Sequence, residues 1–145
     1  MRTPFIAANW KMFKTVHETV VFIKELRSIV KDVDDVEIVI APPFTALHSA
    51  AEAARNSPIG IAAQNAHWER EGAFTGEISV GMVKEAGGDY VIIGHSERRR
   101  LFGETDETVN RRLVAAGMAS PAFTVSRVSR FNATQGPPEP MSPGV

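Results

Sequence analysis

Short apolar segments alternate with longer amphipathic ones along the first 117 residues. The apolar segments lie at residues 5–8, 37–41, 59–63 and 90–93. They are almost wholly apolar and do not alternate with polar residues, which is typical of strands buried on both faces of a parallel sheet. We therefore predict four strands at these positions.

The segments between these strands indicate helices. Apolar residues recur at helical spacing from Val16 to Val30, with charged residues between them. Three further helices are predicted, at 44–55, at 83–86 with Gly87 and Gly88 behind it, and from Thr105 to about Ala116 with Gly117 as its stop.

This order gives four βα units and an α/β fold. Both a doubly wound sheet and an eightfold barrel are built from such units, so the pattern alone leaves the two open. Residues 118–145 carry five of the nine prolines and no periodicity. We expect two parts, 1–117 and a disordered tail at 118–145, with a brief strand at 123–125 as its one ordered element.

Composition excludes several classes of function. Net charge is −1 with acids and bases interspersed, which does not favour nucleic acid or an anionic membrane as a partner. The run Arg98–Arg100 is expected to be a solvated or salt-bridged turn. No cysteine is present, and no apolar run has the length of a signal peptide or a membrane span. A soluble, cytoplasmic protein is expected.

His95 is the leading candidate for chemistry. It follows Gly94 at the end of the fourth predicted strand, and Ser96 and Glu97 behind it read as the cap and first turn of a helix. Catalytic residues of α/β proteins gather at the carboxyl ends of strands, and the positive end of a helix dipole disfavours the imidazolium. A neutral imidazole there could donate to a substrate oxygen. The alternative is a histidine that only caps the turn.

Asn9 and Lys11 follow the first predicted strand at the same end of the sheet. Lysine supplies a point charge for an anionic substrate and asparagine a directional donor, although the pair could equally be a turn residue and a surface cation. Lys11 and His95 could converge on one pocket. Gln64 and Asn65 could brace Lys11 or the pocket floor, whereas the role of His67 stays open.

Glu97 could orient this pocket through Lys11, or act only as an early helix acid. His17 and His48 lie in helical segments and are interpreted as packing or surface residues. No histidines or carboxylates show metal-ligand spacing, and the chain has neither a P-loop nor a glycine-rich dinucleotide turn. We therefore predict no metal site.

Five short motifs occur in order over residues 3–117, and together they resemble the amino-terminal half of triosephosphate isomerase. They are Asn9-Trp10-Lys11-Met12, Ala41-Pro42-Pro43-Phe44, Ala63-Gln64-Asn65, Gly72-Ala73-Phe74-Thr75-Gly76-Glu77 and Gly94-His95-Ser96-Glu97-Arg98-Arg99. The resemblance implies a partial TIM (βα)8 barrel, a cytoplasmic homodimer without a cofactor, and a role in glycolysis and gluconeogenesis. The implied reaction interconverts dihydroxyacetone phosphate and D-glyceraldehyde 3-phosphate.

The resemblance also implies roles for single residues. His95 resembles the family's electrophile; this family is the standard case of a neutral catalytic histidine, so that role comes from the resemblance. Lys11 and Asn9 resemble its substrate-binding residues, with Ser96 and Glu97 as support. Residues 65–79 resemble a loop that inserts into the partner subunit, with Thr75 at its tip near the partner's Lys11 and Glu97.

The chain departs from the family pattern after Gly117. Eight βα units need about 250 residues, and the glutamate that acts as general base, the mobile lid and the later phosphate loops have no match in 118–145. We expect this chain to be inactive alone. The degenerate codons from Arg127 onward permit Gly-Glu-Ser-Leu-Gln-Arg-Asn-Ala-Gly in a shifted frame, so our hypothesis is that the tail reflects a reading-frame slip, which sequencing the gene would test.

Three functions are weighed against one another. The first is a truncated isomerase polypeptide. The second is a half-barrel interaction module that pairs with itself or with a full-length subunit. The third is a different phosphate-handling domain with a doubly wound sheet, which would not explain five ordered motifs.

Overall fold

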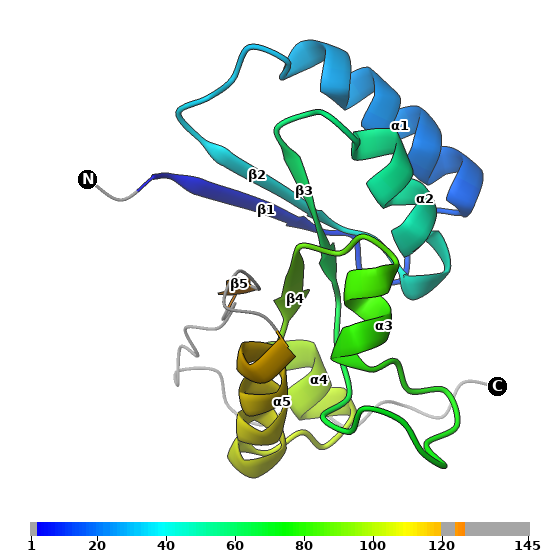
Figure 1. The fold of residues 1–145 in the computed structure, drawn as a ribbon, viewed down its shortest axis with the longest axis vertical. Coiled ribbons are helices and arrows are strands. Elements are labelled where there is room, and N and C mark those ends of the chain that lie inside the picture. The colour runs from blue at the N-terminus through cyan, green and yellow to red at the C-terminus, as the bar shows by residue number, and fades with distance from the viewer. Residues whose placement is uncertain (1–2, 120–123, 127–145) are drawn as a thin grey trace, which may run out of the picture.

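Five parallel strands form one sheet in the computed structural model, which describes residues 3–119 and 124–126. Their order in the sheet, β1-β2-β3-β4-β5, is their order in the chain (Figure 1). The strands are β1 (Phe5–Asn9), β2 (Glu37–Ala41), β3 (Ile59–Ala63), β4 (Tyr90–Ile92) and β5 (Thr124–Ser126). All four predicted strands are confirmed, and a fifth pairs with β4 close to the expected brief strand.

The helices connect successive strands. They are α1 (Val16–Ile29), α2 (Phe44–Ala54), α3 (Val80–Glu85), α4 (Ser96–Leu101) and α5 (Asp106–Ala119). A capping box begins α1: the Glu18 amide donates to the Thr15 hydroxyl, and the Glu18 carboxylate accepts from the Thr15 amide at 2.7 Å. That arrangement satisfies backbone donors that the first turn leaves without partners.

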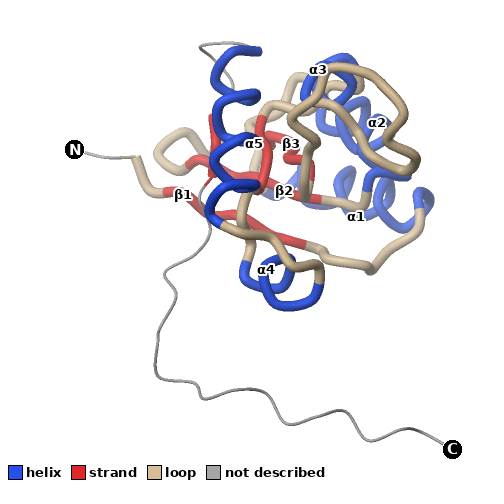
Figure 2. The backbone as a smooth tube through the Cα atoms, turned by 90° about the horizontal axis from the view of Figure 1, so that it is seen from below, coloured by secondary structure: helices blue, strands red, loops and turns tan. Residues whose placement is uncertain are grey.

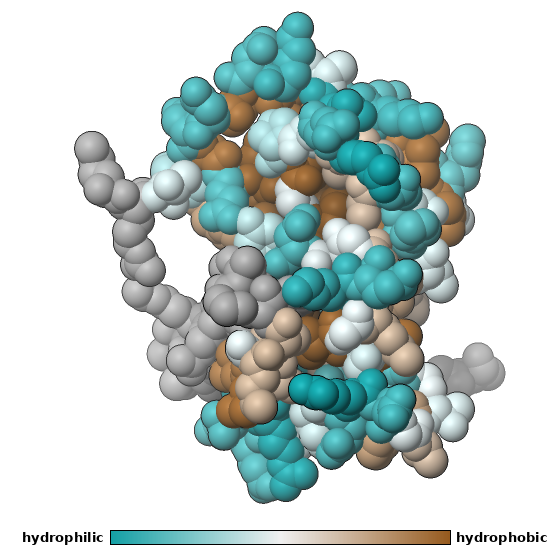
Figure 3. Space-filling view, viewed as in Figure 1, coloured by the Kyte–Doolittle hydropathy of each residue, from teal (hydrophilic) through white to brown (hydrophobic). Residues whose placement is uncertain are grey.

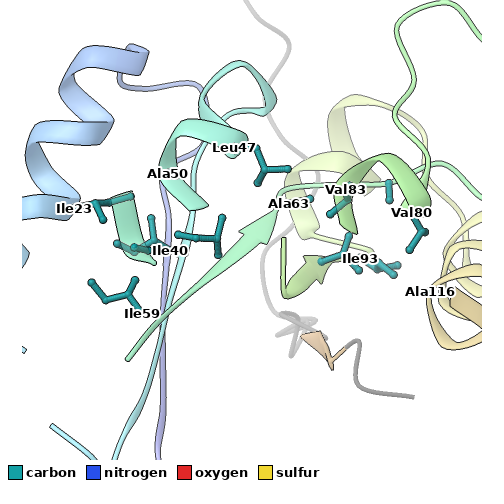
Figure 4. Packing of buried hydrophobic residues seen from close by; sticks show 14 of the residues in the cluster. Ile23, Ile40, Leu47, Ala50, Ile59, Ala63, Val80, Val83, Ile93 and Ala116 are labelled. Atoms are coloured by element: carbon teal, nitrogen blue, oxygen red, sulfur yellow. The ribbon is translucent and has the colours of Figure 1, made fainter. Parts of the chain in front are cut away.

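The sheet alternates between two hydrophobic layers. Ile40, Ile61 and Ile93 point to the face that the helices cover, where Ile23 of α1 and Val83 of α3 join them (Figure 4). The intervening strand residues form a second buried cluster without helical members, and these are Val39, Ala41, Ala62 and Ile92. Strand side chains point alternately to opposite faces, so the second cluster lines what would be a barrel interior.

This arrangement decides between the two α/β folds left open by the sequence. A doubly wound sheet reverses its strand order at a switch point and carries helices on both faces. Here the strands follow chain order, and α1, α2 and α3 lie together on one side of them (Figure 2). The fold is a partial TIM barrel.

The first strand is the exposed edge of the sheet. It pairs with β2 in register from Phe5 opposite Glu37 to Asn9 opposite Ala41, yet Ile6 remains 59% exposed. Hydrophobic residues also reach the surface near α5, where Val114 and Met118 are exposed and brown atoms interrupt the polar surface (Figure 3). An exposed strand edge and scattered apolar surface favour association.

Three details of the sequence prediction need correction. The last helix continues through Gly117 to Ala119, so this glycine does not stop it. The short third helix begins at Val80 and not at 83. The cap of α4 is His95, and Ser96 is its first helical residue. Of the predicted tail, residues 118–119 complete α5 and 124–126 form β5, and the others lie outside the described residues.

Candidate functional site

The loop after β1 holds Lys11 in an unusual backbone conformation. Lys11 has φ of +53°, a left-handed conformation that is uncommon for a residue with a side chain. The Asn9 side chain accepts from the Lys11 amide at 2.9 Å, and the amide of Gln64 donates to the carbonyls of Lys11 and Ala41, both at 2.8 Å. Strained conformations of this kind persist where the surroundings fix them. Gln64 therefore braces Lys11, as the sequence suggested.

Aromatic packing fixes the same loop from the helix side. The Trp10 amide donates to the carbonyl of Ala41 at 3.0 Å, and its ring meets Phe22 of α1 edge to face at 5.2 Å between centroids. The ammonium of Lys14 lies over both rings, 5.3 and 5.1 Å from their centroids. The loop that carries Lys11 is thereby tied to both β2 and α1.

The second part of the site is the turn between β4 and α4. Gly94 has φ of +69°, which lets the chain reverse at the end of the strand. His95 follows as the cap, and its Nδ1 accepts from the Glu97 amide at 3.2 Å. Because Nδ1 accepts, the proton of the neutral ring lies on Nε2. His95 thus caps α4 through Nδ1, and this contact leaves Nε2 as a donor.

Glu97 connects the two parts. Its Oε1 lies 2.7 Å from Nζ of Lys11, and its Oε2 lies 3.6 Å from Nδ1 of His95. The pKa of Glu97 is lowered from its ordinary value, chiefly by the hydrogen bond from Lys11, while partial burial opposes that shift. Glu97 therefore joins Lys11 and His95 at the carboxyl ends of β1 and β4: its carboxylate pairs with the ammonium and its backbone amide donates to the imidazole.

The side chains of this site differ in exposure. That of Lys11 is 51% exposed, whereas that of His95 is 16% exposed. The ammonium can thus meet a solvated anion, while the imidazole lies against the protein. Two cavities lie elsewhere: one of about 400 Å³ beside His67 and α5, the other of about 320 Å³ beside the end of α1.

The arginine run is salt-bridged, as the sequence predicted. Arg98 pairs with the buried Glu104, and Arg99 pairs with Asp106 at 2.7 Å. Sequence reasoning missed the third member of this network: Arg112 of α5 is buried, lies 3.0 Å from the same Glu104 carboxylate and donates to the Ala66 carbonyl at 2.9 Å. The position of Arg112 among the apolar residues of a helix could have indicated a buried charge that needs a partner.

The other candidates have separate places. Ser96 begins α4 and is exposed, and Thr75 is exposed in the loop between β3 and α3. His67 is buried in that loop, where its ring centroid lies 4.3 Å from that of Trp68 and 4.5 Å from that of Phe74. Its Nδ1 lies 3.5 Å from the carboxylate of Glu77. This position makes His67 a packing element of the loop. His17 and His48 are exposed.

Residues 3–119 and 124–126, the part of the chain that the structure describes, contain no metal-binding cluster and no membrane-spanning helix. No three histidine or carboxylate side chains there lie close enough to hold a metal ion. Within the same part of the chain, no helix combines the length and apolar character needed to cross a lipid bilayer.

Comparison with known proteins gives one consistent result. Residues 4–121 match the family model described as TIM, triosephosphate isomerase. Over 116 residues the chain is 57% identical to the triosephosphate isomerase of Trichlorobacter lovleyi and 58% identical to that of Geobacter metallireducens. Each alignment covers 80% of this chain and 46% of the relative.

A solved structure agrees with the sequence comparisons. The crystal structure of triosephosphate isomerase from Bartonella henselae superposes with a TM-score of 0.78 at 36% identity. The superposition covers 86% of this chain and 50% of that one. The chain spans about half the length of the curated relatives it matches. With the motifs, the partial barrel and these matches in agreement, the chain belongs to the triosephosphate isomerase family.

Proposed function

We propose that this chain carries the substrate-binding and electrophilic half of a triosephosphate isomerase site. The substrates are dihydroxyacetone phosphate and D-glyceraldehyde 3-phosphate, in cytoplasmic glycolysis and gluconeogenesis. The observation that carries the proposal is the Glu97 carboxylate, which contacts the Lys11 ammonium at 2.7 Å and lies 3.6 Å from Nδ1 of His95. A cation for the phosphorylated substrate and a ring donor for its carbonyl thus stand side by side.

His95 polarises the substrate carbonyl in this proposal. With Nδ1 engaged by the Glu97 amide, Nε2 donates its proton towards the carbonyl oxygen. That bond strengthens as negative charge grows on the oxygen when a carbon-bound proton leaves, so it lowers the barrier to enolisation. The proton that left is then returned to the neighbouring carbon while a proton moves between the two substrate oxygens, which interconverts ketose and aldose without any redox cofactor.

Lys11 binds the anionic substrate, and its neighbours keep it in place. Glu97 holds the ammonium while the left-handed backbone of Lys11 is fixed by Asn9 and Gln64. The amide nitrogen of Asn9 can donate to the substrate beside Lys11. Ser96, at the start of α4, supports the His95 turn.

The general base is proposed to come from outside residues 1–145. Within the described part of the chain, the carboxylate that contacts Lys11 belongs to Glu97, and its charge is engaged by that ammonium. Loss of a general base lowers a rate by about 10²–10⁴-fold. We therefore expect the purified chain alone to show no isomerase activity above a catalytically inert control.

Substrate binding by the chain itself tests this proposal. Dihydroxyacetone phosphate is titrated into isotope-labelled protein while the Lys11 side chain and the His95 ring are followed by NMR. Both sets of signals should move in the native chain, and the His95 signals should stay unchanged in Lys11→Met, whereas Lys24→Met on the exposed face of α1 should behave like the native chain. Shifts confined to other residues contradict the proposal.

A second function, association through the half barrel, is favoured by the exposed first strand. Ile6 is 59% exposed on the edge strand, and Met12 and Phe13 beside Lys11 are 94% and 71% exposed. Thr75, at the tip of the loop between β3 and α3, is proposed to enter the partner in a homodimer. Light scattering on the chain, alone and mixed with a full-length relative, tests this: a monomer in both samples contradicts it.

A further inference from the structure

Arg99 holds the backbone on both sides of His95. Its side-chain Nε donates to the carbonyl of Gly94 at 3.2 Å, and its own amide donates to the carbonyl of His95 at 3.1 Å. These two carbonyls belong to the peptide groups before and after the His95 Cα. The side chain of Arg99 therefore fixes the peptide before His95, and the first backbone bond of α4 fixes the peptide after it.

The guanidinium that makes this contact is itself held in place. Nη1 of Arg99 lies 2.7 Å from the carboxylate of Asp106, the first residue of α5. A planar guanidinium with donors in fixed directions can bond a carbonyl and a carboxylate at once, which an ammonium on a flexible chain does poorly. The start of α5 is thereby connected to the turn that carries His95.

Packing against α5 also limits the movement of the peptide between Gly94 and His95. Gly94 has φ of +69°, and a Cβ at this position would lie 3.0 Å from both methyl groups of Val109 and 3.5 Å from Nη2 of Arg99. The backbone before His95 thus rests against α5 and against the guanidinium. It has little room to rotate while the Arg99 contact is present.

We propose that Arg99 is a positioning residue for His95. By fixing the peptide between Gly94 and His95, its side chain keeps Nδ1 within reach of the Glu97 amide and so keeps the neutral ring protonated on Nε2. The use of that proton rests on the proposed function. The positioning itself is a property of the free chain and can be measured without substrate.

The test is the tautomer of His95, followed by long-range proton–nitrogen NMR at a pH where the imidazole is neutral. Arg99→Lys keeps the charge and removes the Nε donor. We expect it to lower the ratio of the Nε2-protonated to the Nδ1-protonated form by about 2–10-fold, the equivalent of losing one ordinary hydrogen bond. Arg100→Lys, an exposed neighbour on the same helix, should leave the ratio at its native value.

Asp106→Asn provides a second variant, because the Asp106 side chain is 95% exposed and the fold does not depend on its burial. It should change the His95 ratio in the same direction and by less, and it decides the matter if Arg99→Lys does not fold. The proposal is overturned if the tautomer ratio of His95 stays at its native value in both Asp106→Asn and folded Arg99→Lys. This holds whatever the two substitutions do to the melting temperature. An equal change in Arg100→Lys would also overturn it. Failure of triose phosphate to bind would count against the proposed function alone.

Discussion

The ammonium of Lys11 and the carboxylate of Glu97 meet at 2.7 Å across the carboxyl ends of β1 and β4. They come from βα loops that are far apart in the sequence and separated by two strands in the sheet. The contact forms because parallel strands in chain order bring these loops to one end of the barrel. It places a cation for substrate beside the turn that carries His95.

Glu97→Gln keeps the shape of the side chain and removes its charge. The pKa of Glu97 is lower in the folded state than its ordinary value of 4.5. The ionised pair with Lys11 therefore stabilises the fold fully at pH values above 4.5. That stabilisation is lost as the pH falls through the lowered pKa. We expect the substitution to reduce the free energy of unfolding by about 0.2–1 kcal/mol at neutral pH, because both side chains are partly exposed.

Urea unfolding of both proteins from neutral to acid pH measures this difference. The gap between native chain and Glu97→Gln should close once the carboxylate is protonated in the native chain. Raising the salt concentration at neutral pH should narrow it as well. A gap of the same size at neutral and acid pH contradicts an ionic origin.

The left-handed backbone at Lys11 predicts an unusual preference for glycine. Lys11→Gly and Lys11→Ala both remove the ammonium, so their difference reports on the backbone alone. With φ of +53°, the glycine variant should be more stable than the alanine variant by about 1 kcal/mol. The matched pair Lys24→Gly and Lys24→Ala, inside α1, should show the opposite order. The same order at both positions contradicts the strained conformation.

Gln64→Met should destabilise the chain by about 0.5–1.5 kcal/mol, because it removes the side-chain donor to the carbonyls of Lys11 and Ala41. Denaturant unfolding measures the loss. His17→Met, at an exposed position of α1, is the control and should change stability little. A loss no greater than that of the control would mean that water replaces the Gln64 bonds without cost.

Gly60 of β3 is required by the ring of Tyr90 on the neighbouring strand. A Cβ at Gly60 would lie 2.5 Å from Cε2 of that ring, whose hydroxyl donates to Glu37. Gly60→Ala should therefore cost about 1–3 kcal/mol through overpacking. In a Tyr90→Leu background the cost of the same change should fall, since the shorter side chain leaves room. Equal costs in both backgrounds contradict this contact.

Much of the fold could be predicted from residue patterns. The unbroken apolar runs placed β2, β3 and β4, because strands buried on both faces need no polar alternation. The helix boundaries were less accurate. Gly117 reads as a helix stop, yet Ala116 is fully buried in the core and α5 continues to Ala119. Tertiary packing outweighs the low helix propensity of a single glycine.

The members of the candidate site were predictable, and so were the contacts of Gln64 and Glu97 with Lys11. The position of Lys11 and His95 after strands showed that both belong at one end of the sheet. The strained backbone of Lys11 and the bond from Arg99 to the Gly94 carbonyl could not be predicted from the sequence. Both depend on the positions that side chains and backbone take only in the folded chain. The buried pair of Glu104 and Arg112 was also missed, although Arg112 falls at helical spacing between the apolar residues Val109 and Ala116.

Grafting residues 4–119 of this chain into a full-length triosephosphate isomerase, in place of the matched segment, tests the central claim most directly. The account predicts a folded chimera with isomerase activity, a kcat about 10²–10⁴-fold lower in His95→Gln, a lower kcat/KM in Lys11→Met, and native kinetics in Lys24→Met. A folded chimera without activity, or an active one that tolerates both His95→Gln and Lys11→Met, would contradict it.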